Sequence, residues 1–212
     1  TSDLHPNIYC IQGMAGVGKT TLAAKLVYKT RYHFEDGVLW ADLGSSDPMS
    51  VLVSLAYPFG KDVSEHKDLA TRSQVVRGIL SAKHALLVLD NVQESEDIEA
   101  LIPPSGTCAV IVTTRRTNLR ATRNAQVFRI EPFDREEEES FALFTEVLGL
   151  DRAQHEKDIL TDIADTLGHL PLSIDIAASR LSLEPNWESS EFLEYIREEN
   201  RRLDTLQFDD SS

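Results

Sequence analysis

Short apolar runs alternate with amphipathic stretches along the first two thirds of the chain. The apolar runs lie at residues 8–12, 38–43, 85–90, 109–113 and 127–130. Between the first four, apolar residues recur at helical spacing near residues 20–30, 49–57, 69–81 and 94–102. Strands that are apolar along their whole length are buried on both faces, so this alternation predicts an α/β fold in which helices cover both sides of a parallel sheet.

The pattern changes after Pro132, where only helical spacing remains. Asp134, with Glu137 three residues later, predicts a capping box at the start of the first helix of this part. The spacing predicts four short helices, marked by Phe141, Phe144 and Leu148; by Ile159, Ile163 and Leu167; by Pro171 to about Leu183; and by Phe192 and Ile196. We therefore predict two domains, residues 1–132 and a small four-helix subdomain at residues 133–212.

Composition narrows the class of protein. No apolar run approaches the roughly 20 residues that span a bilayer, and the first residues lack the features of a signal peptide. The formal net charge of −14 repels nucleic acid and anionic membranes, so we expect this segment to bind neither. Cys10 and Cys108 each lie in an apolar run, which indicates buried thiols in a reducing compartment and a cytoplasmic protein. The six histidines show no metal-ligand spacing.

The segment GMAGVGKT at residues 13–20 matches the phosphate-binding pattern G-x-x-x-x-G-K-[ST] in full. It follows an apolar strand and opens a helix, so backbone N–H groups from Gly16 to Thr21 can point at phosphate oxygens. Lys19 supplies a positive charge to the β- and γ-phosphates, and the Thr20 hydroxyl coordinates Mg²⁺. The predicted nucleotide-binding residues of this loop are Gly13, Ala15, Gly16, Val17, Gly18, Lys19, Thr20 and Thr21.

Two further strands end in groups suited to phosphate chemistry. The strand ALLVLD at residues 85–90 ends in Asp90, which is typical of a Walker B carboxylate that holds Mg²⁺ through water. The strand in VIVTTRR ends before Arg115, a candidate for sensing the γ-phosphate. The predicted catalytic residues are therefore Lys19, Asp90 and Arg115, and the predicted metal ligands are Thr20 and Asp90.

Four segments in this order, GMAGVGKTTLA, LLVLDNV, VIVTTR and GHLPLSIDIAASRL, resemble the NB-ARC domain of STAND signalling ATPases. Residues 34–40 and the sequence after Pro185 resemble bacterial members more than plant ones. The resemblance implies a five-stranded parallel P-loop NTPase sheet in the order 5-1-4-3-2, followed by an ARC1-like helical subdomain. It also implies that Pro171 packs on an adenine base. The expected ligands are ADP or ATP with Mg²⁺, and the guanine-reading motif [NT]-K-x-D is absent.

The resemblance implies a switch in which ADP holds a closed state and exchange for ATP permits opening and self-association of the full-length protein. Family members continue into a winged-helix domain with a Met-His-Asp motif, which this sequence lacks, so that domain and any sensor or effector domains are expected outside this segment. A Val-Gly-Arg segment before the first strand is also missing. Asn91 stands where many members have a second acid, which predicts slow or negligible hydrolysis and at most a weak Mg²⁺-dependent ATPase.

Two other functions stay open at this point. A conventional P-loop ATPase or small-molecule kinase with multiple turnover would need an acceptor pocket and a catalytic acid near Asp90. Glu94, Glu96 and Asp97 are candidates for that acid, although their spacing also fits the start of a helix. A nucleotide-free interaction scaffold would need an inactive phosphate loop, which the intact Lys19 and Thr20 disfavour.

Overall fold

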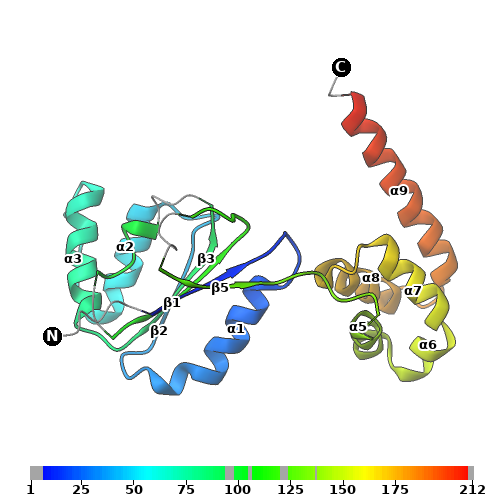
Figure 1. Ribbon diagram of the computed structural model, residues 1–212, viewed down its shortest axis with the longest axis horizontal. Coiled ribbons are helices and arrows are strands. Elements are labelled where there is room, and N and C mark those ends of the chain that lie inside the picture. The colour runs from blue at the N-terminus through cyan, green and yellow to red at the C-terminus, as the bar shows by residue number, and fades with distance from the viewer. Residues whose placement is uncertain (1–6, 94–97, 105–106, 120–123, 137, 210–212) are drawn as a thin grey trace. The chain divides into compact units, whose positions relative to one another are not determined.

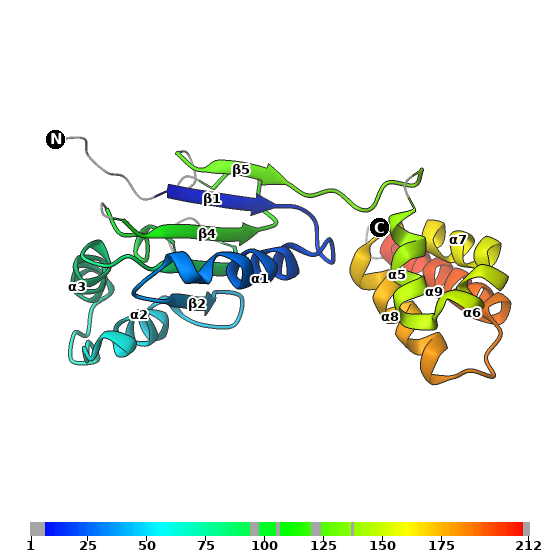
Figure 2. The ribbon, with the colours of Figure 1, turned by 90° about the horizontal axis from the view of Figure 1, so that it is seen from below.

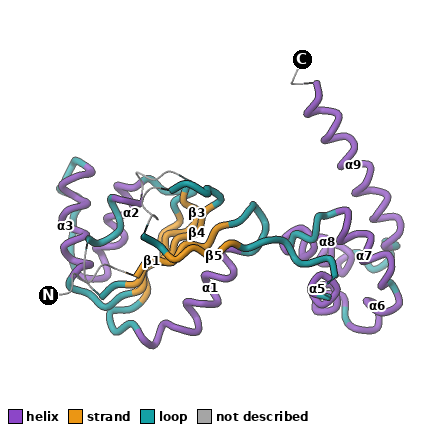
Figure 3. Tube along the Cα trace, in the orientation of Figure 1, coloured by secondary structure: helices purple, strands orange, loops and turns teal. Residues whose placement is uncertain are grey.

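The computed structural model describes the chain except for residues 1–6, 94–97, 105–106, 120–123, 137 and 210–212. The chain forms two compact units, Thr1–Ile130 and Glu131–Ser212. Among the described residues, every strand belongs to the first unit, and the second unit contains helices and loops (Figure 3).

The first unit is built on one five-stranded sheet. Its strands are β1 Asn7–Gln12, β2 Val38–Asp42, β3 Leu86–Val92, β4 Ala109–Thr114 and β5 Gln126–Arg129. They lie in the order β2-β3-β4-β1-β5, and each neighbouring pair is parallel (Figure 2). This is the predicted order 5-1-4-3-2 read from the opposite edge, so the predicted fold class is confirmed.

Helices cover both faces of the sheet. Helix α1 Lys19–Thr30 lies on one face, and α2 Pro48–Ala56 and α3 Leu69–Ser81 lie on the other (Figure 1). Successive residues of β3 divide between the two sides: Leu86 and Val88 belong to the core cluster under α1, and their neighbours belong to the cluster under α2 and α3. This two-sided burial explains why the inner strands β3 and β4 are largely apolar. The edge strands β2 and β5 have exposed residues. Short 3₁₀ turns follow α1 at Arg31–His33 and α2 at Tyr57–Phe59.

The second unit has five described helices: α5 Glu139–Leu148, α6 Leu150–His155, α7 Lys157–Thr166, α8 Pro171–Leu183 and α9 Ser189–Asp209. The prediction of four short helices was therefore wrong in two respects. Gly149, at φ 86°, separates α5 from α6, whose six residues bury only Ala153 and are too few to show a helical period. Helix α9 is 21 residues long rather than short.

The predicted start of the first helix was also wrong. Helix α5 begins at Glu139, five residues after the expected cap. The Asp134 carboxylate instead accepts a hydrogen bond of 2.8 Å from the Glu136 N–H, which forms a local turn before the helix. Glu137, the second member of the expected capping box, lies outside the described residues.

Candidate functional site

The phosphate loop leaves β1, which lies between β4 and β5 in the sheet. Gly16 and Gly18 take φ values of 78° and 94°, a backbone region that residues with a Cβ rarely adopt. Gly18 is the N-cap of α1, so the first N–H groups of the helix face the loop. Val17 is 3% exposed and anchors the loop in the protein. The loop thus presents backbone donors and a helix N-terminus, which together favour a bound anion.

Lys19 begins α1, and its Nζ donates a hydrogen bond of 2.7 Å to the Met14 carbonyl. Burial and then the charge of Arg115 lower the pKa of Lys19, while the Asp90 carboxylate acts in the opposite direction. Arg115 and Asp90 are therefore both close enough to Lys19 to act on its charge. A bound phosphate would stabilise the positive charges of Lys19 and Arg115, which otherwise repel each other.

Thr20 and Asp90 are far apart in sequence but are hydrogen-bonded in the structure. The Thr20 hydroxyl lies 3.0 Å from Asp90 Oδ1 and 3.1 Å from Oδ2. Asp90 lies near the end of β3 and is only 6% exposed. A hydroxyl and a carboxylate next to a phosphate loop are the oxygen donors that Mg²⁺ takes in nucleotide sites. The residues fit the predicted ion: Thr20 would bind it directly and Asp90 through water.

Thr113 is a member of the site that the sequence analysis did not single out. It lies in β4, is 1% exposed, and donates a hydrogen bond to Asp90 Oδ1. Its oxygen also accepts a hydrogen bond of 2.9 Å from the Asn91 N–H. The signal available in the sequence was a pair of hydroxyl residues, Thr113 and Thr114, directly after a fully apolar run.

Asn91 follows Asp90 with φ 59°, the left-handed region that asparagine tolerates better than most residues. A Cβ placed on Gly44 would lie 1.9 Å from Asn91 Nδ2 and 3.2 Å from Asp42 Oδ1. The side-chain amide of Asn91 therefore packs against Gly44, as does the Asp42 carboxylate. Asp42 accepts hydrogen bonds from the Gly44 N–H at 2.9 Å and from the Ser45 hydroxyl at 3.1 Å.

The remaining predicted residues are placed as follows. Arg115 directly follows β4 and has an exposed side chain. Pro171 is the first residue of α8, in the second unit, and its contact with adenine stays a prediction. The candidate acids Glu94, Glu96 and Asp97 lie within residues 94–97, which are outside the described part of the chain. No group of three or more His, Cys, Asp or Glu residues within the described ranges could hold another metal ion.

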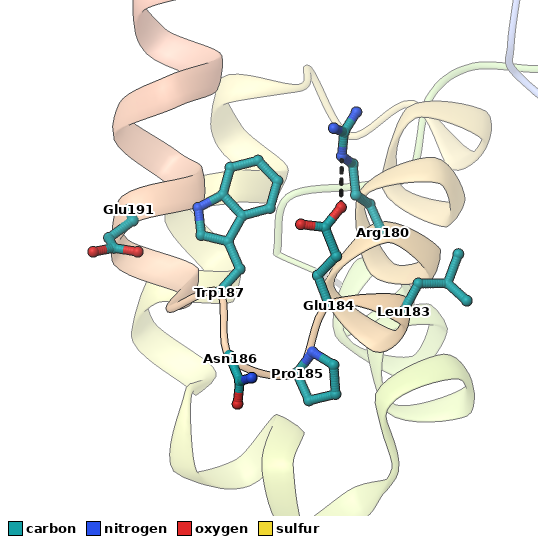
Figure 4. A pocket seen from close by; sticks show the side chains of 7 residues that line it. All are labelled: Arg180, Leu183, Glu184, Pro185, Asn186, Trp187 and Glu191. Carbon is teal, nitrogen blue, oxygen red and sulfur yellow. Dashed lines mark ion pairs between the residues drawn. The ribbon is translucent and has the colours of Figure 1, made fainter.

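The second unit has an open hollow where α8 ends and α9 begins (Figure 4). Its lining residues are Arg180, Leu183, Glu184, Pro185, Asn186, Trp187 and Glu191. Arg180 lies 3.7 Å from Glu184 in an ion pair and 5.4 Å above the Trp187 ring. Its charge is thus already paired within the hollow, and no glycine is among the lining residues that could form a phosphate loop.

A parallel sheet in this order, with a phosphate loop after β1 and a carboxylate at the end of β3, defines the chain as a P-loop NTPase. Solved structures with a similar fold include Cdc6p from Pyrobaculum aerophilum, with a TM-score of 0.53 and 18% identity over 86% of this chain and 57% of that one. A chain of the Drosophila ORC bound to DNA gives a TM-score of 0.54 and 14% identity over 95% of this chain and 63% of that one. At these identities the likeness concerns the fold alone.

The NB-ARC domain family matches residues 2–154, more than half of the sequence, and the chain belongs to this family. The regulatory protein AfsR of Streptomyces griseus is 34% identical over 209 residues, which cover 96% of this chain and 21% of AfsR. The ToMV susceptible protein tm-2 of Solanum lycopersicum is 29% identical over 198 residues, which cover 84% of this chain and 22% of that protein. The chain thus spans about a fifth of the length of these relatives. Among the described residues, no helix is long and apolar enough to cross a membrane.

Proposed function

We propose that this chain is the ATP/ADP-binding switch module of an NB-ARC signalling protein. The observation that carries the proposal is the convergence of Lys19, Thr20 and Asp90 at one end of the parallel sheet, with the charge of Arg115 acting on Lys19. These side chains surround a loop whose backbone favours an anion. Membership of the NB-ARC family supports a signalling role for the nucleotide.

Each residue has a distinct role in this proposal. The loop N–H groups and Lys19 bind the phosphates, Thr20 and Asp90 hold Mg²⁺, and Arg115 responds to the γ-phosphate. The bound ion would neutralise phosphate charge. Asn91 carries an amide, which cannot accept a proton from attacking water, so hydrolysis is slow. A slow reaction suits a protein whose output depends on which nucleotide is bound.

The wider mechanism involves two proposed domains, an NTPase domain at residues 1–132 and a helical subdomain at residues 133–212. Pro171 of the helical subdomain contacts the adenine, so that the nucleotide bridges the NTPase domain and the subdomain. Exchange of ADP for ATP then changes a closed arrangement to an open one and permits self-association of the whole protein. The description of AfsR as a regulatory protein supports this class of output.

Calorimetric titration tests the binding site. Wild-type protein is titrated with ADP, ATP and GTP in Mg²⁺, beside a Lys19→Met variant that keeps the apolar part of the side chain. We expect both adenine nucleotides to bind more tightly than GTP, and the variant to bind them roughly 10- to 100-fold more weakly because charge-assisted hydrogen bonds are lost. Equal affinities of wild type and variant would overturn the proposal.

Steady-state phosphate release separates the switch from a multiple-turnover ATPase or kinase. We expect a rate far below the roughly 10 s⁻¹ typical of enzymes, with or without small-molecule hydroxyl acceptors. Acceptor-dependent ATP consumption at an ordinary enzymatic rate would establish the turnover function instead.

A further inference from the structure

Strands β3 and β4 fall out of register beside Asp90. Leu89 pairs with Val112, and the next pair is Val92 with Thr114. Asp90 and Asn91 on β3 therefore stand opposite the single residue Thr113 on β4, which is the arrangement of a β-bulge. A bulge removes the extra residue from the regular ladder of hydrogen bonds, so the Asn91 N–H needs another acceptor.

The Thr113 hydroxyl supplies that acceptor and makes a second bond at the same time. It accepts from the Asn91 N–H at 2.9 Å and donates to Asp90 Oδ1. One buried hydroxyl thus holds the backbone that follows Asp90 and also the carboxylate of Asp90 itself. The carboxylate lies between two hydroxyls, Thr113 on the protein side and Thr20 on the side of the phosphate loop.

We propose that Thr113 is a positioning residue for the magnesium–nucleotide site, which it serves by fixing the bulge and aiming the Asp90 carboxylate at Thr20. This inference rests on the proposed function, because it takes Asp90 to be one of the two residues that hold Mg²⁺. A donor behind a metal ligand limits the orientations of that ligand, and its loss typically weakens metal affinity by about 10- to 100-fold. Loss of the Thr113 hydroxyl should therefore weaken nucleotide binding in the presence of Mg²⁺ but not in its absence.

Thr114 offers a matched control for the structural part of this role. It is also 1% exposed and also bridges β4 to β3, donating to the Val92 carbonyl at 2.7 Å. Its oxygen accepts from the Arg116 N–H at 3.0 Å. These bonds support the strands beyond the bulge, whereas the Thr113 bonds reach Asp90. A Thr→Val change at either position removes a buried hydroxyl while keeping nearly the same shape.

The test compares the binding of a fluorescent ATP analogue in Mg²⁺ and in EDTA for the wild type, Thr113→Val, Thr113→Ser and Thr114→Val. The readout is the ratio of the two affinities, which a general loss of stability does not change. We expect the ratio to fall about tenfold or more in Thr113→Val, with little change in EDTA. Thr113→Ser keeps the hydroxyl, and Thr114→Val leaves Asp90 untouched, so both should keep the wild-type ratio within about threefold.

Thermal melting without nucleotide establishes that each variant folds, and Thr113→Ala replaces Thr113→Val if the latter does not fold. The inference is wrong if the Thr113 variant keeps the wild-type ratio, or if Thr114→Val lowers it equally. Failure of the proposed function looks different, because the wild type itself would then bind no nucleotide in either buffer. That result would overturn both proposals.

Discussion

The surroundings of Lys19 disfavour its positive charge when no anion is bound. Burial and the nearby Arg115 charge lower its pKa, and its ammonium donates to a loop carbonyl, that of Met14. A phosphate placed between Lys19 and Arg115 would remove their mutual repulsion. The two cations therefore favour phosphate binding electrostatically, in addition to the backbone donors of the loop.

The amide at Asn91 gives the first prediction. Asn91→Asp would place a second carboxylate beside Asp42, so like-charge repulsion would oppose its ionisation. We expect Asn91→Asp to raise ATP hydrolysis only slightly, and Asn91→Asp combined with Asp42→Asn to raise it about tenfold or more, since a working base contributes at least that much. Phosphate release at pH 7 measures both. If the double variant hydrolyses ATP no faster than the wild type, the missing base does not explain slow hydrolysis.

At the scale of elements, one arginine supports the segment between α2 and α3. Arg72 is 7% exposed and donates to three backbone carbonyls, those of Met49, Ser64 and His66. Backbone oxygens left without donors in the interior are costly, so this side chain stabilises the junction of α2, the following loop and α3 through its hydrogen bonds.

The second prediction follows from these bonds. Arg72→Met should lower the free energy of unfolding by about 2–4 kcal/mol, because several charge-assisted hydrogen bonds are lost together. Arg77, also in α3, has a buried Nε without a hydrogen-bond partner among the described residues, and Arg77→Met should cost less than about 1 kcal/mol. Urea unfolding compares the two. Equal losses would show that the Arg72 contacts contribute little.

The third prediction concerns a chain of side chains that joins α5, α7 and the turn before α8. The Ser140 hydroxyl lies 2.9 Å from His169 Nδ1, and His169 Nε2 lies 2.8 Å from Asp165 Oδ1. The hydrogen bond from His169 and the charge of Arg135 lower the pKa of Asp165 from its ordinary value of 3.8. The stability that Asp165 contributes is therefore present above pH 3.8 and is lost as the pH falls through the lowered pKa.

Melting temperatures of the wild type and Asp165→Asn at pH 5 and pH 3 test this sign. We expect the wild type to melt higher at pH 5. The difference should shrink at pH 3, where the carboxyl group of the unfolded chain is largely protonated and part of the contribution of Asp165 is lost. A difference that stays constant between the two values would contradict the assignment.

The elements also show what the sequence could and could not predict. The strands and the phosphate loop were predictable because apolar runs and glycine spacing are visible in the local sequence. Thr113 was missed because its role depends on a bulge, and a bulge depends on how β3 pairs with β4. Helix α6 was missed because Gly149 separates a segment too short to show a period, and the start of α5 was misplaced because Asp134 forms a local turn instead of a cap.

At the scale of the whole molecule, the proposed switch requires a nucleotide that contacts both compact units. Pro171 is the residue through which the second unit is proposed to reach the adenine. It occupies the first position of α8, where alanine is also compatible with a helix, so replacing it should leave the unit folded.

The fourth prediction uses this tolerance. Pro171→Ala should weaken ADP binding about tenfold, because two buried CH₂ groups contribute roughly 1.6 kcal/mol against the base. Calorimetry measures the affinity, and the melting curve of the nucleotide-free variant serves as the control for folding. An unchanged affinity would mean that the second unit does not pack on the adenine, and would leave the phosphate site intact.

The proposal that this chain binds an adenine nucleotide is tested by identifying the nucleotide that accompanies the protein through purification. The protein is denatured, and the released small molecules are separated by chromatography and quantified against protein. We expect ADP or ATP in near-equal amount to the wild-type chain and almost none with Lys19→Met. Wild-type protein that releases no nucleotide, and binds none when it is added with Mg²⁺, would overturn the proposed nucleotide site.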